Sequence, residues 1–439
     1  MPANGQMNRR EYLKSAAALL IPASAMGWDG NVAASDRITV GAIGVGNRAT
    51  EDLRRLLPQK EARVVAICDV NSRNRDAALT LINKTYGDNA CREYRDFREL
   101  LNQKDIDAVL IGSPDHWHVA MIVAAARAGK DMYSEKPLGL AISWSQAARA
   151  AVHRHGVVFQ WGTQQHAQRW YAYAVKLAQS GAIGELKEVR TWVPDSEWRG
   201  DRVPEAAKVV PVPDYLDWDM WLGPAPYTPY TEGKERGWYG NSDYSHGTIC
   251  NWGVHNMDIC LWGLSNRAAR TMEVEGTAAF PREGASDNAT GWDLTYRFDH
   301  GVPIHYKSLG RIPEEWSRRY RWMSDHGVAF EGTDGWVQVN RERISAEPAS
   351  LLKNLGEAPD ARSESTADLQ RDFLRCVRSR GKPLAGIDHA AQTDIACIIG
   401  DMAVRLGTRL RWDLQEERFL NNDTANRLRT RAMRSPWQA

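Results

Sequence analysis

Lys136 is the first residue whose type and position suggest chemistry. It stands between Glu135 and Pro137, directly after the short strand predicted for residues 131–134. A proline biases the residue before it toward extended backbone, so the lysine is aimed rather than freely mobile. An aimed ammonium group can polarise a substrate hydroxyl or carbonyl oxygen. The alternative is a surface ion pair of Glu135 with Lys136 that has no part in a reaction.

A histidine at the start of a predicted helix is the second candidate. The segment from Asn251 to Asp258 opens this helix, which runs to about Gly263. Residues 251 and 255 can share one face of the helix, as can residues 255 and 258. His255 suits a general base for an alcohol proton because the pKa of histidine lies near working pH, and Asp258 is placed to orient it. The alternative is a hydrogen-bonded histidine at a helix start.

A third polar segment, at residues 113–118, raises the question of a metal. His116 and His118 are spaced as two ligands of one ion, but the only carboxylate near them is Asp115. Metal sites need more donors than this set supplies, so we expect no metal. The alternative role of the segment is a turn beside a cofactor, followed by a helix cap.

The elements that position these residues begin with a strand–turn–helix–strand unit between Arg37 and Asp69. An apolar run ends in a G-x-G-x-x-A turn at 44–49, a polar stretch with helical spacing follows, and a second apolar run stops at Asp69. This order is typical of a dinucleotide site. Gly44 allows the tight turn, Gly46 lets the backbone reach the pyrophosphate, and the acid takes the ribose 2′-hydroxyl.

The cofactor predicted by this unit is NAD, with NADP as the alternative. Asp69 favours NAD, and Arg73 or Arg75 nearby would blur that preference. The start of the helix offers unpaired N–H groups to the phosphates. Gln164 follows the strand that closes the domain, where it either contacts nicotinamide or substrate or bonds the domain junction. The predicted cofactor-binding residues are Gly44, Gly46, Asn47, Arg48, Asp69, Ser113, Pro114, His118, Glu135, Lys136 and Gln164.

The rest of the chain divides into two kinds of pattern. Strands and helices alternate as far as residue 161, which predicts a parallel, doubly wound sheet with ligands outside the carboxyl ends of its strands. From residue 162 the apolar segments are longer and β-rich, which predicts a second, mainly antiparallel sheet. The region from Pro194 to Tyr244 is a long loop dense in aromatic residues, and such loops usually cover a site or an interface.

The N-terminus has the order of a secretory signal. Arg9 and Arg10 precede the apolar run 16–21, and a small-x-small cleavage site follows at 23–25. Paired arginines indicate the twin-arginine route, so we expect a periplasmic or otherwise exported protein that meets the twin-arginine export machinery. A merely basic amphipathic N-terminus is the alternative. Export beside a dinucleotide site further predicts a tightly bound cofactor.

Composition excludes other classes. The chain has 439 residues, 43% of them hydrophobic, and a net charge of +1 with dispersed basic residues, which argues against a nucleic-acid partner. No apolar run is long enough for an integral membrane segment. The six cysteines show neither a C-x-x-C motif nor metal-ligand spacing, so we expect them to be small buried hydrophobic residues.

Four motifs in order resemble the glucose–fructose oxidoreductase, inositol dehydrogenase and MocA family (Gfo/Idh/MocA). They are G-x-G-x-x-A at 44–49, Ser-Pro-Asp-His-Trp-His at 113–118, Glu-Lys-Pro at 135–137 and G-x-H-x-x-D at 253–258. The closing region resembles that of its exported, twin-arginine members. The resemblance implies an α/β fold with an N-terminal Rossmann domain and a C-terminal α/β domain whose large, mainly antiparallel open sheet often forms the oligomer interface. It also implies bound NAD(P), carbohydrate substrates and a homo-oligomer.

This resemblance assigns the segments of the chain. We expect residues 1–34 to be a signal peptide and linker, 36–161 a Rossmann NAD(P)-binding domain, 162–345 a C-terminal substrate and oligomerisation domain, and 346–439 a connector and helices packing back on both domains.

In dehydrogenases of the family, the Glu-Lys-Pro lysine and an Asp-x-x-x-His pair surround the reacting carbon. Lys136 and His255 match, but Asn251 stands at the aspartate position, and an amide cannot accept a proton at neutral pH. The catalytic residues we expect are Lys136, His255, Asn251 and Asp258. Three functions stay open: an NAD(P)-dependent oxidoreductase of a sugar, glycoside or polyol, a redox-assisted NAD-dependent glycosidase, and a non-catalytic sugar-binding relative.

Overall fold

The structure is a computed structural model, and it describes residues 36–196, 208–231, 234–265, 267–320, 323–353 and 361–438. The predicted signal peptide and parts of the aromatic loop and of the connector lie outside these residues. Within the described chain, no helix is long and apolar enough to cross a membrane.

The N-terminal domain is built on a six-stranded sheet in the order β3-β2-β1-β4-β5-β6, with all neighbours parallel. Its central strands are buried almost without interruption, as expected for strands covered on both faces by helices. This confirms the predicted doubly wound Rossmann domain. Its strands are β1 (Ile38–Ile43), β2 (Ala62–Cys68), β3 (Arg92–Tyr94), β4 (Ala108–Ile111), β5 (Asp131–Ser134) and β6 (Phe159–Trp161). Its helices are α2 (Asn47–Leu56), α3 (Ser72–Tyr86), α4 (Phe97–Leu101), α5 (His118–Arg127) and α6 (Ile142–His155), with the 3₁₀ turns η4 (Asp115–Trp117) and η5 (Gln164–Ala167) at its strand ends.

The second sheet has nine strands in the order β13-β12-β11-β7-β10-β9-β8-β14-β15. Only the β7–β10 pair is parallel, so the prediction of a large, mainly antiparallel sheet is confirmed. Its strands are β7 (Leu186–Val193), β8 (Thr271–Ala279), β9 (Gly291–Phe298), β10 (Pro303–Ser308), β11 (Gly327–Gly332), β12 (Trp336–Val339), β13 (Ile344–Glu347), β14 (Leu410–Asp413) and β15 (Arg418–Phe419).

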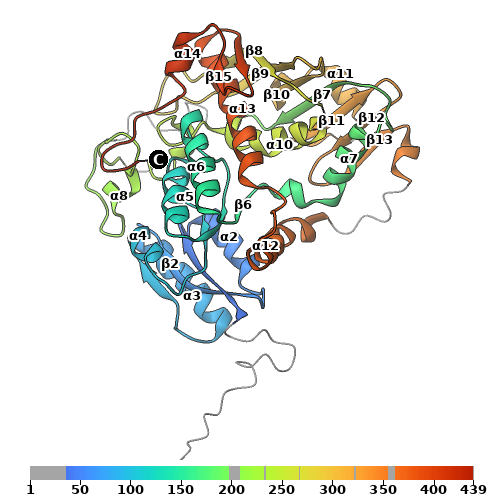
Figure 1. The fold of residues 1–439 in the computed structure, drawn as a ribbon. Coiled ribbons are helices and arrows are strands. Elements are labelled where there is room, and N and C mark those ends of the chain that lie inside the picture. Colours follow the sequence, from blue (N-terminus) through green and yellow to red (C-terminus); the bar gives the residue numbers. More distant parts are fainter. Residues whose placement is uncertain are drawn as a thin grey trace, which may run out of the picture.

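Three helices pack on this sheet and join it to the Rossmann domain (Figure 1). They are α7 (Arg169–Gln179), α10 (Gly253–Leu264) and α13 (Ile387–Leu406). Helix α13 packs against both β8 and α6, and α12 (Ala361–Ser379) packs against α2. The remaining elements are α8 (Trp218–Leu222), α9 (Thr248–Asn251), α11 (Glu314–Arg319) and α14 (Asp423–Arg427), with the 3₁₀ turns η6 (Trp238–Gly240), η7 (Leu309–Arg311) and η8 (Ala349–Leu352).

The segment predicted as a connector and helices also contributes strands. The expected boundary at residue 345 falls within β13, and β14 and β15 extend the sheet beyond β8. β14 joins the sheet because Leu410 and Trp412, two residues apart, lie on one face of the strand and are both buried. The chain then returns to the first domain, where Trp437 packs edge-on against Trp117 with ring centroids 4.6 Å apart.

Candidate active site

The G-x-G-x-x-A turn at 44–49 has a conformation that requires glycine at residue 44. Gly44 has a φ of +73°, and a Cβ there would lie 2.6 Å from the backbone nitrogen of Ser113. Only glycine therefore fits the conformation and the space. The Asp69 carboxylate closes the turn from the next strand, accepting hydrogen bonds from the backbone N–H of Val45 (2.9 Å) and Asn71 (2.8 Å). The acid at this position both orders the turn and faces the cavity beside it.

A cavity of about 750 Å³ runs along the carboxyl ends of these strands. Its size suits a large ligand, and its walls combine backbone of the turn with charged side chains. The sequence-predicted residues on its walls are Gly44, Gly46, Asn47, Arg48, Asp69, Ser113, Pro114, Glu135, Lys136 and Asn251. Arg75 lies beside Asp69, because its guanidinium donates to the Asp69 carbonyl at 2.7 Å and pairs with Glu93 at 3.2 Å.

The aromatic loop covers the cavity. Tyr215, Trp221 and Trp238 of this loop are among the residues that line it. The 113–118 segment holds this cover, because the Trp117 indole N–H donates to the carbonyl of Trp221 and His116 Nε2 lies at 3.0 Å from the same oxygen. Burial lowers the pKa of His116 to about 4. His116 is therefore neutral near pH 7, and its Nε2 atom is engaged with the Trp221 carbonyl.

Two predicted cofactor residues lie behind the cavity wall. His118 is buried, with Nδ1 2.6 Å from the carbonyl of Pro137 and Nε2 2.8 Å from that of Ser113. It joins the strand-end loop to the Glu-Lys-Pro turn. In the amide orientation that suits its neighbours, the Gln164 side-chain oxygen accepts a hydrogen bond from Arg48 Nη1 at 3.2 Å. Both residues position the groups that line the cavity.

Lys136 begins a buried polar chain. Its ammonium donates to the Asn251 side-chain oxygen at 2.5 Å and to the Asn251 carbonyl at 3.1 Å. The Asn251 amide N–H₂ donates to both oxygens of Asp115 at 3.2 Å, and the Ser245 hydroxyl donates to Asp115 at 2.6 Å. Burial lowers the pKa of Lys136 to about 8, against the opposing pull of Glu135 and Asp115. Asn251 therefore bridges a cation and an anion, which a carboxylate at that position could not do.

His255 lies one helical turn further along and is buried. Its Nδ1 atom has no hydrogen-bond partner among the described residues. Burial holds the pKa of His255 well below its ordinary value, and the positive charges of Arg341 and Lys136 lower it further. The imidazole is consequently neutral near pH 7, and the same effects make it a weaker base than the ordinary histidine expected from the sequence.

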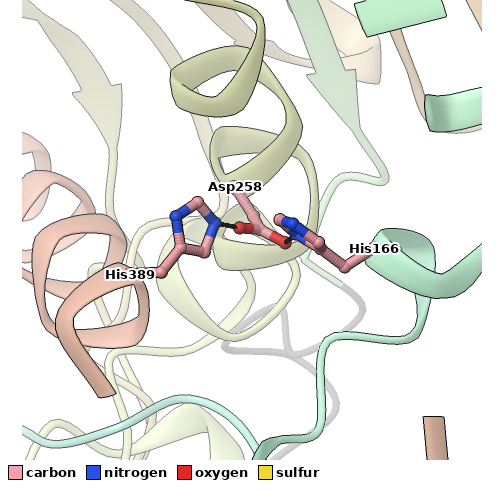
Figure 2. Close-up of side chains that lie close together, drawn as sticks. All are labelled: His166, Asp258 and His389. Carbon is pink, nitrogen blue, oxygen red and sulfur yellow. Dashed lines mark hydrogen bonds and ion pairs between the residues drawn. The ribbon is translucent and has the colours of Figure 1, made fainter. Parts of the chain in front are cut away.

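Asp258 does not orient His255, so the predicted pairing is wrong. Its carboxylate oxygens have other partners: one accepts from the Thr163 hydroxyl at 2.7 Å and from His166 Nδ1 at 3.1 Å, and His389 contacts the other (Figure 2). Residues three apart on a helix are neighbours, but their side chains diverge when stronger partners lie to one side. Here η5 and α13 supply those partners.

The Asp258 cluster is the one group of at least three potential metal ligands within the described chain. Ligand atoms of His166, Asp258 and His389 all lie within 4.8 Å of one another. Hydrogen bonding accounts for the arrangement, because Thr163 and both imidazoles satisfy the carboxylate oxygens. His166 is also stacked on Trp262, with ring centroids 4.0 Å apart. Burial alone would raise the pKa of Asp258, but His389 and His166 hold it below its ordinary value.

Family models match both parts of this architecture. The NAD-binding Rossmann domain of the Gfo/Idh/MocA oxidoreductases matches residues 38–163, and their C-terminal alpha/beta domain matches residues 176–439. The chain belongs to the Gfo/Idh/MocA oxidoreductase family. Its N-terminal domain is an NAD-binding domain, as the residues around the Gly44 turn indicate.

Curated relatives resemble part of this family member. Inositol 2-dehydrogenase of Salmonella typhimurium is 30% identical over 150 residues, covering 34% of this chain and 43% of the relative. A glycosyl hydrolase family 109 protein of Parabacteroides distasonis is 33% identical over 141 residues, covering 28% of this chain and 30% of the relative. Each match therefore spans less than half of the relative.

Solved structures share the fold over most of the chain. Scyllo-inositol dehydrogenase of Lactobacillus casei, with bound NAD(H) and scyllo-inositol, superposes with a TM-score of 0.60 at 16% identity, covering 85% of this chain and 99% of that one. Aldose-aldose oxidoreductase of Caulobacter crescentus superposes with a TM-score of 0.63 at 17% identity, over the same shares of each chain.

Sequence reasoning missed two residues at this Gfo/Idh/MocA site. Asp115 was weighed only as a metal ligand, although its position after a strand end was a signal for the site. Arg341 follows β12, some 86 positions beyond His255, and no local pattern marks it. Its charge nevertheless acts on both His255 and Lys136.

Proposed function

We propose that this family member is an NAD-dependent oxidoreductase acting on a sugar, glycoside or polyol hydroxyl, with NADP as the alternative cofactor. The observation that carries the proposal is the convergence of Lys136 and Asn251 on the wall of the NAD cavity, with neutral His255 one turn away. Bound NAD supplies hydride transfer at its nicotinamide ring.

The residues take complementary roles in this proposal. His255 accepts the hydroxyl proton on oxidation and returns it on reduction, because its imidazole is held neutral. Lys136 donates a hydrogen bond to the substrate oxygen as negative charge develops there. Asn251 holds the ammonium in place through its side-chain oxygen, while Asp115 fixes the orientation of that amide.

A redox-assisted NAD-dependent glycosidase is the second candidate. The similarity to the glycosyl hydrolase family 109 protein favours it. The two activities differ in their products, because the glycosidase releases free aglycone without net NADH. A non-catalytic sugar-binding relative is the third candidate, and the His255 Nδ1 atom, which has no partner in the described part of the chain, argues against it.

The deciding experiment starts from purified protein. Denaturation should release NAD, which mass spectrometry identifies, and sugars and polyols are then screened by the change in absorbance of the bound nicotinamide at 340 nm. Reduction by at least one of them is expected. Release of aglycone without net reduction would favour the glycosidase, and an unchanged spectrum with every compound would contradict both enzymatic candidates.

We further propose that the protein is exported by the twin-arginine machinery to the periplasm, retains its cofactor tightly and forms a homo-oligomer through the nine-stranded sheet. The arginine pair at residues 9–10 supports export, and the aromatic cover over the cavity supports retention. Cell fractionation, the mass of the mature N-terminus and light scattering of the purified protein test the three parts separately. Dialysis for days followed by assay without added NAD tests retention.

A further inference from the structure

Arg341 carries a buried positive charge that the described chain leaves without a hydrogen-bonded partner at two atoms. Its Nε and Nη2 atoms are both buried, and neither has a hydrogen-bond partner. Guanidinium stays charged under all ordinary conditions, and a buried charge without partners is costly. Most buried polar groups are satisfied, so two orphaned donors on one side chain call for a ligand.

The side chain is held beside His255. The Arg341 guanidinium lies over the indole of Trp252, 4.6 Å from the ring centroid, and the His255 ring packs edge-on against the same indole at 5.8 Å. Its backbone N–H is 3.3 Å from Nε2 of His326, whose ring also packs on Trp252. Trp252 thus fixes Arg341 and the proposed base on one platform.

Carboxylates near this platform are already engaged. Glu135 forms an ion pair with Arg48 (3.3 Å) although neither of its oxygens is hydrogen-bonded, and Asp115 is hydrogen-bonded by Asn251 and Ser245. Asp325 is bonded to His326 at 2.7 Å. The largest charge effects on the pKa of His255 come from Arg341, Lys136 and Arg48, and each of them lowers it. None of these carboxylates hydrogen-bonds to Arg341 Nε or Nη2, so both atoms lack an anionic partner among the described residues.

The two free atoms define the shape of the missing partner. Nε and Nη2 form one edge of the guanidinium, and their N–H bonds run parallel, which matches the two oxygens of a planar carboxylate. We propose that Arg341 binds a carboxylate of the substrate, which makes this protein an oxidoreductase of acidic sugars such as uronates or aldonates. The inference rests on the proposed function and specifies its substrate class.

The test compares matched sugars on the holoprotein. D-glucuronate is set against D-glucose, and D-galacturonate against D-galactose, with kcat/KM measured from the nicotinamide absorbance. We expect the acids to be preferred by about 10- to 100-fold, the range for a charge-assisted pair. Arg341→Met should abolish that preference, measured as the ratio of kcat/KM for the acid to that for the neutral sugar within one variant, because any change in the pKa of His255 or Lys136 affects both sugars alike. Arg341→Lys keeps the positive charge but loses the two parallel N–H donors, so its preference for the acids should lie between those of the parent protein and Arg341→Met.

Calorimetric titration of D-glucuronate and D-glucose into the holoprotein supplies a readout apart from activity. D-glucuronate should bind to the parent protein and bind at least about 10-fold more weakly to Arg341→Met. Arg154→Met, at an exposed position on α6, is the matched control and should change nothing. The NAD released on denaturation should be the same in all variants, which separates a substrate role from a cofactor role.

Three outcomes would overturn the inference. Equal or better use of the neutral sugars, equal loss on both members of a pair, or stronger binding of D-glucose 6-phosphate than of D-glucuronate would each contradict a carboxylate partner. If no sugar alters the nicotinamide spectrum but D-glucuronate still binds through Arg341, the proposed activity fails while the anion site stands.

Discussion

Helix α10 carries two buried polar clusters that differ in how completely they are satisfied. On one side, the Asp258 carboxylate is bonded by Thr163, His166 and His389. On the other side, His255 Nδ1 and two nitrogens of Arg341 have no hydrogen-bond partner among the described residues. A closed network stabilises a fold, whereas orphaned donors and acceptors are typical of a site that completes itself with a ligand. We therefore expect Asp258 to contribute to stability and His255, three positions earlier on the same helix, to the proposed reaction.

The largest effect should come from opening the closed cluster. Asp258→Ala leaves His166, His389 and Thr163 without their shared acceptor and should lower the free energy of unfolding by about 3–5 kcal/mol, the range for breaking a buried pair. Urea denaturation measures the change. Asp76→Ala, at an exposed position of α3, is the matched control and should be nearly neutral. A small effect at Asp258 would mean that the cluster is not structural.

Removing the Lys136 ammonium should instead affect turnover. Lys136→Met takes away the donor to the developing oxyanion and should lower kcat by about 10²–10³-fold, with bound NAD retained. Steady-state kinetics on a substrate found by the screen, together with the nucleotide released on denaturation, separate the two effects. Near-normal turnover would exclude Lys136 from the chemical step.

Restoring the family aspartate should harm the protein. Asn251→Asp places a carboxylate against Asp115, where the amide N–H₂ now donates, so repulsion and the lost hydrogen bonds should cost about 1–3 kcal/mol of stability. Thermal denaturation measures the loss. The double variant Asn251→Asp with Asp115→Asn exchanges the two groups and should recover part of it. An unchanged melting temperature in the single variant would show that the amide bridge contributes little.

Activity should depend on pH through Lys136. Its pKa is lowered by burial to about 8, so the ammonium is charged below that pH and loses its proton above it. Because the proposed role needs the charged form, kcat should fall as pH rises through about 8. The pH profile over 6 to 10, at saturating substrate, measures this limb. A rate that climbs through the same range would make neutral Lys136 a base.

Chelators should have the smallest effect. The Asp258 cluster is satisfied by hydrogen bonds, so prolonged incubation with EDTA should change neither activity nor melting temperature. Elemental analysis by mass spectrometry of the untreated protein is the companion measurement. Stoichiometric zinc or manganese, with a lower melting temperature after EDTA, would show that the cluster binds metal.

Local sequence patterns predict most of the Rossmann domain. The glycine turn, the acid after β2 and the Glu-Lys-Pro segment after β5 each follow a strand, and parallel strands bring their carboxyl ends together. Sequence order therefore predicts that these residues meet. The same reasoning could not find β14 and β15, because their few apolar residues stand among charged ones, and β14 forms only by pairing with β8, far earlier in the chain.

The sequence by itself determined the fold class, the dinucleotide turn and the two residues, Lys136 and His255, that the family places at its reacting centre. Tertiary structure alone decided which side chains those residues meet. It turned Asp258 toward His166 and His389, set Asn251 between Lys136 and Asp115, and brought Arg341 from beyond β12 onto Trp252. Helical spacing places a side chain on a face, but its hydrogen-bond partners come from whichever elements pack there, and those lie far along the chain.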